Sequence, residues 1–413
     1  MKTESEIVAR QYHAWVYPQP IDDLEKAIQE THYHDYGDPA LIRRKIWPRK
    51  VEPDALEILV AGCGANQAAY LAYKNPNCHI VGIDISENSL GHQKFLKQKH
   101  GLKNLDLYLM SLGDVAKLGQ MFDYVVSTGV LHHLPDPEAG LRCLREVLVK
   151  PHGVMHIALY GQYRRAGVYM LQEVFRTLGV QQTPEGVALV KATLAALPPN
   201  HHVQSYLTAA RDLGYDSGLV DTFLHPQDRA YTVPQLMAFA RDNGLKFQAW
   251  TDNVTHSVEA LLGREHPLYA HIKSQPEELQ WHLLDLLTHQ IGFPMFFLCH
   301  PERPEHDYRL DFSGTSSEAP WLDYRPIVRA PVTVVEKANQ DKNTPAVFER
   351  NGQTFRLGYQ AAVLFASSKG AASIREVLEA QPWFQANPVE GVEVARQFYA
   401  QMADWDHLMF EIP

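Results

Sequence analysis

The segment that decides the fold is residues 58–67, whose sequence is Ile58-Leu59-Val60-Ala61-Gly62-Cys63-Gly64-Ala65-Asn66-Gln67. A run of apolar, strand-forming residues ends here in two glycines that one residue separates. Glycine allows the backbone to turn sharply from a strand into a helix, and it lets a ligand approach the main chain closely. Taken alone, the pattern also fits a tight strand-to-helix turn that binds nothing, so its meaning depends on the residues that follow.

An acidic residue follows the glycines at a distance typical of nucleotide-binding sheets. Asp84 ends the next apolar run about 20 residues further along the chain. In such sheets an acidic side chain at this place accepts hydrogen bonds from ribose hydroxyls. Asp84 could instead cap the following helix, although Ser86 or Asn88 would serve that purpose equally well. Together, the glycines and the acid favour a ligand that contains ribose.

Around these motifs, short apolar or β-branched runs alternate with helical stretches, which is the pattern of a parallel sheet packed against helices. The expected strands are 56–61, 79–85, 105–110, 122–127, 154–160, 246–250 and 294–300. The expected helices are 67–74, 89–100, 137–149, 167–178, 184–197, 205–213 and 233–243. We therefore predict an α/β fold, namely a Rossmann-like, doubly wound sheet with helical insertions.

At 413 residues the chain exceeds what one hydrophobic core usually organises. The domains that we expect are a helical lid at 1–50, the sheet domain at 51–304 with a helical insertion at 162–230, and an accessory domain at 318–413. In the last of these, Asn351-Gly352 interrupts an alternating stretch and predicts a hairpin, which two helical stretches follow. This order predicts a small α+β, winged-helix-like domain.

Composition limits the possible partners. With 45% hydrophobic and 21% charged residues, and no apolar run near the ~20 residues that cross a bilayer, we expect a soluble protein without a membrane partner. The N-terminus lacks the organisation of a secretion signal, which predicts a cytoplasmic protein. The four cysteines lie far apart, so we expect neither a disulfide framework nor a metal. A net charge of -10 disfavours nucleic acid as a partner.

Two further motifs relate residues 56–160 to a known family. One is Gly113-Asp114-Val115, and the other is Phe122-Asp123-Tyr124-Val125-Val126-Ser127-Thr128-Gly129-Val130-Leu131-His132-His133-Leu134. With the glycine loop and Asp84, they resemble the core of class I S-adenosylmethionine-dependent methyltransferases. The resemblance implies a methyltransferase enzyme whose cofactor is S-adenosyl-L-methionine. It assigns cofactor-binding roles to Ala61, Gly62, Gly64, Asn66, Asp84, Ile85, Asp114, Val115, Thr128 and His133.

The sequence departs from the family pattern in the glycine loop. An acidic residue usually precedes the first glycine and a third glycine often follows, whereas Val60-Ala61 and Asn66 stand at these places. How the amino-acid end of the cofactor is held therefore stays open. Asp106 and Ser111 flank the third expected strand and are alternatives to Asp114 on the adenine side.

Methyl transfer from a sulfonium is an in-line displacement, so the protein mainly positions the acceptor and receives its proton. The candidate catalytic residues are His132, which follows the fourth strand, and His225 and Asp228, which lie in a polar loop. The candidate substrate contacts are Tyr12, Tyr17, Tyr160, Arg229 and Tyr231. Structural alternatives exist for all of them: a histidine pair that packs the cofactor, aromatic residues that dock an N-terminal helix, and an ion-paired loop.

Three hypotheses remain open for the substrate. The tyrosine-proline start, the glycine loop and the segment 224–232 are similar to bacterial protein methyltransferases, in particular to the phycobiliprotein asparagine methyltransferases. This similarity implies a protein substrate that is methylated on an asparagine amide. The alternatives are an O- or N-methyltransferase of a small metabolite and a non-catalytic, cofactor-binding scaffold.

Overall fold

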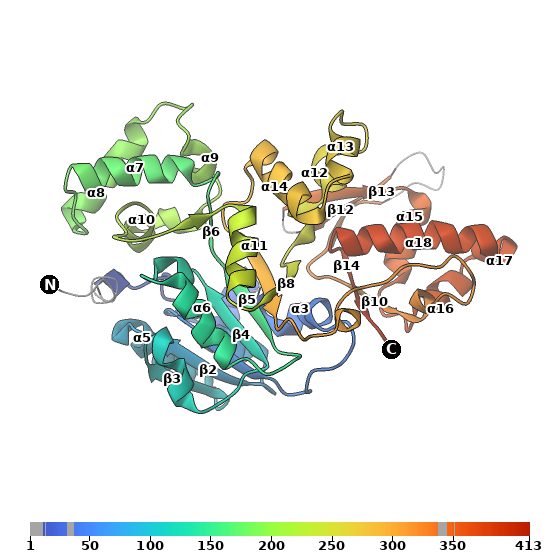
Figure 1. The fold of residues 1–413 in the computed structure, drawn as a ribbon, viewed down its shortest axis with the longest axis horizontal. Helices are drawn as coiled ribbons and strands as arrows, with labels where there is room; N and C mark the ends of the chain where they lie inside the picture. Colours follow the sequence, from blue (N-terminus) through green and yellow to red (C-terminus); the bar gives the residue numbers. More distant parts are fainter. Residues whose placement is uncertain (1–10, 13, 31–36, 338–344, 351) are drawn as a thin grey trace. The chain divides into compact units, whose positions relative to one another are not determined.

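The computed structural model describes residues 11–12, 14–30, 37–337, 345–350 and 352–413. The chain forms two compact units, each with a hydrophobic core (Figure 1). The first unit comprises Met1–Gly37, Pro53–Thr251 and Leu261–Arg303, and the second comprises Asp38–Glu52, Asp252–Ala260 and Pro304–Pro413.

A seven-stranded sheet organises the first unit. Its strands lie in the order β3 (Leu105–Leu109), β2 (His79–Asp84), β1 (Glu57–Ala61), β4 (Tyr124–Thr128), β5 (Val154–Ala158), β9 (Met295–Cys299) and β8 (Lys246–Trp250). Neighbours from β3 to β5 are parallel, and β9 is antiparallel to both β5 and β8. The strand order reverses between β1 and β4, and ligands bind such sheets in the crevice at the carboxyl ends of these strands. The predicted Rossmann-like fold is confirmed.

Helices pack against this sheet, and the sequence predicted four of them, at 67–74, 89–100, 137–149 and 233–243, but not the helix Glu277–Thr288. They are α4 (Gln67–Lys74), α5 (Glu87–His100), η2 (Leu112–Leu118), η3 (Leu131–His133), α6 (Pro137–Glu146), α11 (Val233–Asp242) and α14 (Glu277–Thr288), with α2 (Leu24–Glu30) before them. The hydroxyl of Ser86 caps α5 by accepting a hydrogen bond from the backbone N–H of Ser89. Thr232 and Gln235 form a capping box at the start of α11.

The segment between β5 and α11 forms a helical insertion, coloured green in Figure 1, with apolar residues that make a separate cluster. Its helices are α7 (Ala166–Thr177), α8 (Pro184–Ala196), α9 (Gln204–Leu207), η4 (Arg211–Gly214) and α10 (Asp216–Phe223). The sequence predicted one helix at 205–213 and none at α10, and this was wrong. The backbone approaches itself closely here. The carbonyl oxygen of Asp212 lies 1.9 Å from the place that a Cβ on Gly218 would occupy, so this position requires glycine.

A second correction concerns the fifth strand, which was predicted to reach Tyr160. The strand ends at Ala158, and β6 (Tyr160–Gly161) pairs instead with β7 (Ala230–Tyr231) in a separate two-stranded sheet. This pairing links the end of β5 to the start of α11. The sequence analysis also missed three short elements between β8 and α14, namely η5 (Asn253–His256), α12 (Val258–Leu262) and α13 (Tyr269–Lys273).

The second unit combines two antiparallel sheets with helices. The sheets are β10 (Arg325–Val328) with β14 (Leu408–Glu411), and β11 (Thr333–Glu336) with β12 (Ala346–Arg350) and β13 (Gln353–Leu357). The helices are α3 (Pro39–Ile46), η6 (Glu305–Asp307), η7 (Pro320–Asp323), α15 (Tyr359–Ser367), α16 (Ile374–Glu379), α17 (Pro382–Ala386) and α18 (Pro388–Asp404). The predicted hairpin is present as β12 and β13, although Asn351 lies outside the described residues. The winged-helix-like assignment stays a prediction.

Buried charges attach α3 to the second unit. The Lys45 ammonium bonds to the Asp406 carboxylate, and burial lowers the pKa of Lys45 to about 8. Arg329 contacts the same carboxylate at 3.4 Å. The sequence analysis had grouped residues 38–50 with an N-terminal lid and residues 51–52 with the sheet domain, because such a pairing with the C-terminal region leaves no local pattern.

We predict that Lys45→Met destabilises the second unit by about 3 kcal/mol, because breaking a buried ion pair leaves a carboxylate short of one partner. Urea unfolding, monitored for each unit, measures the change. The control is Lys26→Met in α2, whose side chain is 72% exposed and pairs with Glu30. This control should change stability by less than about 0.5 kcal/mol. Equal effects of the two substitutions would contradict a structural role for the buried pair.

Candidate functional site

The glycine loop has the conformation that only glycine adopts easily. Gly62 and Gly64 have φ angles of 74° and 54°. A Cβ on Gly62 would lie 2.3 Å from a methyl group of Val130, in the turn that follows β4. Gly62 therefore lets the β1 and β4 loops approach each other at the point where the strand order reverses.

Asp84 stands beside this loop and is held by main-chain groups. Its carboxylate accepts hydrogen bonds of 2.8 Å from the backbone N–H groups of Gly64 and Ser86. Burial raises the pKa of Asp84, and these hydrogen bonds partly offset the shift. Since Ser86 caps α5, Asp84 is not needed as the cap, and the next side chain, Ile85, is 39% exposed.

The other expected cofactor residues differ in their availability. The Asn66 amide accepts a hydrogen bond from the backbone of Ile21 and donates one to the Gln19 carbonyl, so it fastens the N-terminal segment to the loop. The Thr128 hydroxyl donates to Gln67. Ala61 and Val115 lie in the sheet core, and Asp114 is half-exposed and paired with Lys117.

Residues of the N-terminal segment contact the glycine loop, and the lid role stays a prediction. The carbonyl oxygen of Tyr17 is 2.9 Å from the place of a Cβ on Gly64. The hydroxyl of Ser86 donates a 3.0 Å hydrogen bond to the Tyr12 carbonyl oxygen. The Tyr17 hydroxyl reaches the insertion, where it donates to Asp212 at 2.9 Å.

Five side chains from distant parts of the sequence meet next to this loop. We call them the acceptor cluster: Tyr12, His133, Tyr160, Asp221 and His225. The buried Asp221 carboxylate accepts hydrogen bonds from the hydroxyls of Tyr12 at 2.8 Å and of Tyr160 at 3.1 Å. The ring centroids of His133 and His225 lie 3.9 Å apart. One ring nitrogen of each histidine and one carboxylate oxygen of Asp221 all lie within 4.8 Å of one another.

Burial controls the ionisation of the cluster. It raises the pKa values of Tyr12, Tyr160 and Asp221. It lowers the pKa of His133 to about 4 and that of His225 well below the usual value, and the Arg165 guanidinium lowers both further. Near neutral pH both histidines are therefore uncharged, and each offers one hydrogen-bond donor and one acceptor.

The three expected catalytic residues are in different situations. His132 stacks on Tyr160 at 3.8 Å, and neither of its ring nitrogens has a hydrogen-bond partner among the described residues. His225 belongs to the acceptor cluster. The Asp228 carboxylate is occupied by a buried ion pair with Arg165 at 3.2 Å, so it orients that guanidinium and is not a free base.

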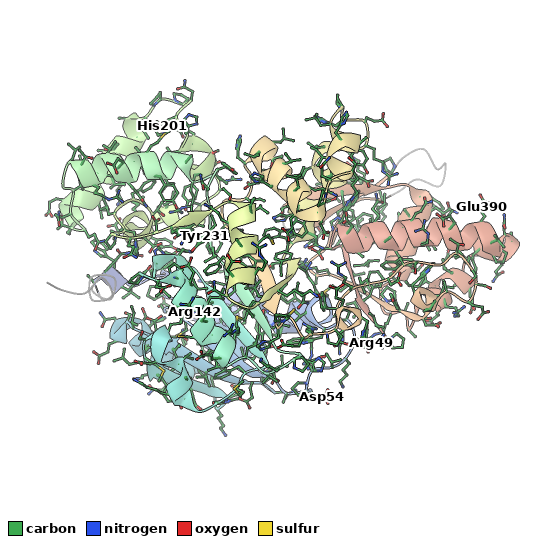
Figure 2. The ribbon with its side chains drawn as sticks, in the orientation of Figure 1. Arg49, Asp54, Arg142, His201, Tyr231 and Glu390 are labelled. Atoms are coloured by element: carbon green, nitrogen blue, oxygen red, sulfur yellow. The ribbon has the colours of Figure 1, made fainter. Side chains whose placement is uncertain are left out.

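Two of the expected substrate contacts adjoin the acceptor cluster through their backbones, but their side chains have other partners. Arg229 is exposed and pairs with Glu138 at 3.1 Å. Tyr231 lies in β7, at the start of α11 (Figure 2), and its buried side chain belongs to the sheet core. The ion-paired loop that the sequence analysis kept as an alternative describes Arg229, whereas Tyr231 is a core residue.

The sequence analysis did not identify Asp221 and Arg165 as site residues. Arg165 is completely buried, donates to the Tyr206 hydroxyl at 2.7 Å and stacks over the Tyr160 ring at 3.5 Å. An available signal was the aspartate inside the apolar run 218–224, since a buried carboxylate requires partners. Arg165 gave no such signal, because it follows the polar segment 162–164 and stands at the start of a helix, where arginine is usually exposed.

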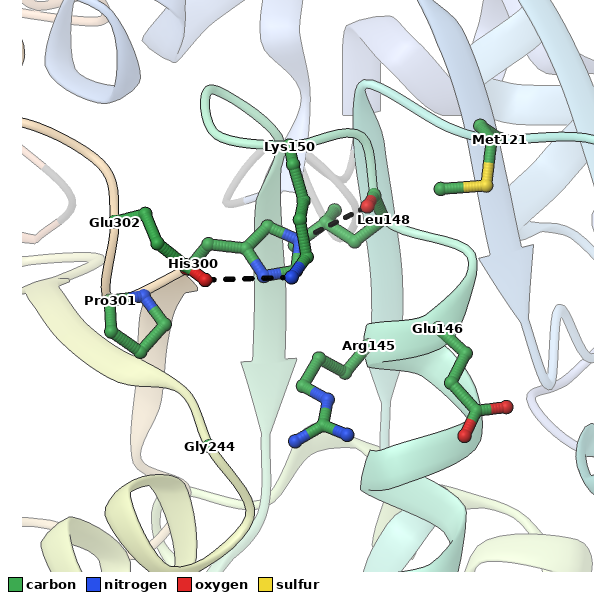
Figure 3. Close-up of a pocket in the computed structure, with 9 residues that line it drawn as sticks. All are labelled: Met121, Arg145, Glu146, Leu148, Lys150, Gly244, His300, Pro301 and Glu302. Carbon is green, nitrogen blue, oxygen red and sulfur yellow. Dashed lines mark hydrogen bonds and ion pairs between the residues drawn. The ribbon is translucent and has the colours of Figure 1, made fainter.

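A cavity of about 490 Å³ lies at the opposite edge of the sheet (Figure 3). Leu148 and Lys150 precede β5 and His300 follows the antiparallel β9, which places the cavity at the amino ends of the strands. Several of its polar groups are paired, since His300 bonds to the Leu148 carbonyl and Lys150 to Glu302. The ligand crevice of this fold is at the other edge, beside the acceptor cluster.

We predict that the His133 imidazole titrates near pH 4 and not near 6.5, which NMR of its ring C–H groups measures. The unfolded chain binds this proton near pH 6.5, whereas the folded chain does not. The stability that the neutral ring contributes is therefore present above pH 6.5 and is lost as the pH falls toward 4. His133→Phe should reduce this loss in acid unfolding experiments. Titration at the usual pKa would contradict the burial of the ring.

Comparisons with known proteins agree with this geometry. Residues 53–206 match the family described as "Methyltransferase domain". An uncharacterized protein of Synechococcus sp. is 31% identical over 258 residues, which are 61% of this chain and 62% of that protein. The chain thus spans less than two thirds of this relative. An uncharacterized protein of Rickettsia prowazekii is 31% identical over 86 residues, which are 20% of this chain and 15% of that protein.

The same fold occurs in a solved structure. PKMT2 from Rickettsia typhi, in complex with AdoHcy, has a TM-score of 0.66 at 15% identity, over 91% of this chain and 76% of that chain. This likeness concerns the fold, while the family match covers the glycine loop, Asp84 and the His132-His133 pair. Residues 53–206 therefore match a methyltransferase-domain family, and the chain has the fold of that solved structure over 91% of its length.

Proposed function

We propose that this protein transfers a methyl group from S-adenosylmethionine to a polar acceptor that binds at the acceptor cluster. The observation that carries the proposal is the position of this cluster. Tyr12 connects it to the Asp84 side of the crevice through Ser86, and His133 connects it to the turn after β4. A group bound there would lie beside the ligand crevice of the sheet.

The residues at the crevice fit the cofactor. Gly62 and Gly64 leave room for it beside their backbone, and the Asp84 carboxylate keeps lone pairs that can accept from ribose hydroxyls. Exposed Ile85 offers an apolar surface to the adenine ring. Asn66 supports the N-terminal segment, which would cover the amino-acid end. When bound, the cofactor supplies an electrophilic methyl group on a sulfonium.

We propose a protein side chain as the acceptor, and specifically an asparagine amide. The similarity of the tyrosine-proline start and of the 224–232 segment to phycobiliprotein asparagine methyltransferases supports this choice. An amide nitrogen is a poor nucleophile, so it needs neighbours that polarise it and receive its proton. The acceptor cluster offers uncharged imidazoles and a carboxylate for these tasks.

A small metabolite is the second candidate acceptor. It is favoured by the burial of the cluster, because Asp221 and His225 are 2% and 3% exposed. A protein side chain would reach these groups only if the segment that carries Tyr12 moved aside. The two candidates therefore differ in how far the N-terminal segment must open.

We predict that Asp84→Asn weakens AdoHcy binding by about 10-fold or more, because hydrogen bonds to a charged carboxylate are stronger than those to an amide. Isothermal titration calorimetry measures the affinity. The matched control is Asp242→Asn at the end of α11, whose exposed carboxylate pairs with Arg241. It removes the same charge and should leave the affinity unchanged. An equal loss in both variants would argue against a direct contact with Asp84.

The proposed activity is tested by incubating the full chain with methyl-labelled S-adenosylmethionine and a host lysate. We expect label in one protein band, absent with the Asp84→Asn variant, and mass spectrometry of that band should place the methyl group on asparagine. Label on a different side chain would contradict the asparagine assignment. Label that appears only among small molecules would favour the metabolite. Binding of AdoHcy without any transfer would contradict catalysis.

A further inference from the structure

One residue controls the hydrogen-bonding state of both histidines in the acceptor cluster. Nδ1 of His133 lies 3.1 Å from the Gln227 carbonyl oxygen, and the backbone N–H of the same Gln227 donates to Nδ1 of His225 at 3.0 Å. The Gln227 side chain is itself anchored by a hydrogen bond to the Leu134 carbonyl oxygen at 3.1 Å. Two imidazoles thus face opposite ends of one anchored peptide segment.

These contacts dictate opposite tautomers. A carbonyl oxygen only accepts, so Nδ1 of His133 carries the proton, and its Nε2 keeps a lone pair. An N–H only donates, so Nδ1 of His225 keeps the lone pair, and its Nε2 carries the proton. This Nε2 of His225 is buried and has no partner within the described part of the chain. Burial keeps both rings uncharged, so the tautomers persist near neutral pH.

Neighbouring groups argue against a metal ion at this place, although two histidines and a carboxylate within 4.8 Å could suggest one. Coordination through Nε2 of His225 would require a proton on Nδ1, which faces the N–H of Gln227. The Asp221 carboxylate already accepts from two tyrosine hydroxyls. The Arg165 guanidinium also disfavours positive charge on both rings.

We infer that His133 and His225 form a recognition pair for a carboxamide, in which Nε2–H of His225 donates to the amide oxygen and Nε2 of His133 accepts from the amide N–H. A primary amide presents one acceptor and one donor side by side. The two rings, whose centroids lie 3.9 Å apart, carry the complementary donor on His225 and acceptor on His133. An ammonium group has no acceptor for the His225 donor. A carboxylate has no donor for the His133 lone pair.

This inference rests on the proposed function and gives it a residue-level basis. During transfer the N–CH3 bond forms as the S–CH3 bond breaks, the sulfur keeps the electron pair, and the amide nitrogen must lose one proton. His133 Nε2 would receive that proton from the N–H that it already binds. The Asp221 carboxylate stands near enough to stabilise the resulting imidazolium. The donor from His225 keeps the amide oxygen in place.

The tautomers are tested by NMR on the full chain with isotope-labelled histidine, the signals being assigned with His133→Phe and His225→Phe variants. The ring nitrogen shifts should show the proton on Nδ1 in His133 and on Nε2 in His225. The same tautomer in both rings, or a charged ring near neutral pH, would overturn the inference. This readout needs no cofactor and no turnover.

Recognition is tested with acetamide as the probe, and with acetate, methylamine and Zn²⁺ as competitors of different chemistry. Acetamide should shift the ring signals of both histidines, and His133→Phe or His225→Phe should weaken its binding at least about 10-fold. The control His271→Phe changes an exposed histidine of α13 and should have no effect. Stronger binding of methylamine, acetate or Zn²⁺, or no response to acetamide, would overturn the inference.

The inference and the proposed function fail in different ways. Acetamide binding with the expected tautomers but without any methyl transfer would leave the recognition pair in place and contradict the enzymatic proposal. Methyl transfer to a protein together with no acetamide response would support the enzymatic proposal and contradict the recognition pair.

Discussion

The buried carboxylate of Asp221 is the constraint on which the candidate site depends. A charge in the interior is tolerated only if it is paired or hydrogen-bonded. Asp221 meets this requirement with Tyr12 from the N-terminal segment and Tyr160 from the end of the sheet. Helix α10 of the insertion carries Asp221 itself. Satisfying one carboxylate therefore brings three separate segments together beside the crevice.

Arg165 provides the opposite charge at the same place. Its guanidinium is shared between Asp228, the Tyr206 hydroxyl and the face of the Tyr160 ring. The neighbouring histidines are uncharged mainly because burial lowers their pKa values, and the Arg165 guanidinium lowers them further, whereas Asp228 partly offsets the shift of His133. The outcome is a site that offers directional hydrogen bonds to a neutral ligand and little attraction for a cation.

The second unit follows the same principle with different residues. Asp406 is buried and bound by Lys45 and Arg329, and Asp252 accepts from Arg350 at 2.9 Å. Three parts of the chain that are distant in sequence contribute to this charge network. The composition of the unit predicted a separate domain near the C-terminus, but it did not predict that α3 and residues 252–260 would join it. Within the described residues, no helix has both the length and the apolar character of a membrane-spanning segment.

The amino-acid sequence by itself determined the sheet and its cofactor-side loop. Each strand that it predicted for the sheet is present within two residues at either end, and Gly62, Gly64 and Asp84 meet as expected. These features are local, since they depend on hydrophobic period, on glycine conformation and on a short spacing. Only the tertiary structure decided which polar side chains share the acceptor cluster. The hydroxyl of Tyr12 reaches Asp221 across 209 positions in the sequence, and Gln227 sets the tautomer of His133 across 94. Such contacts leave no periodic signal, because they arise from the packing of the insertion and the N-terminal segment on the sheet.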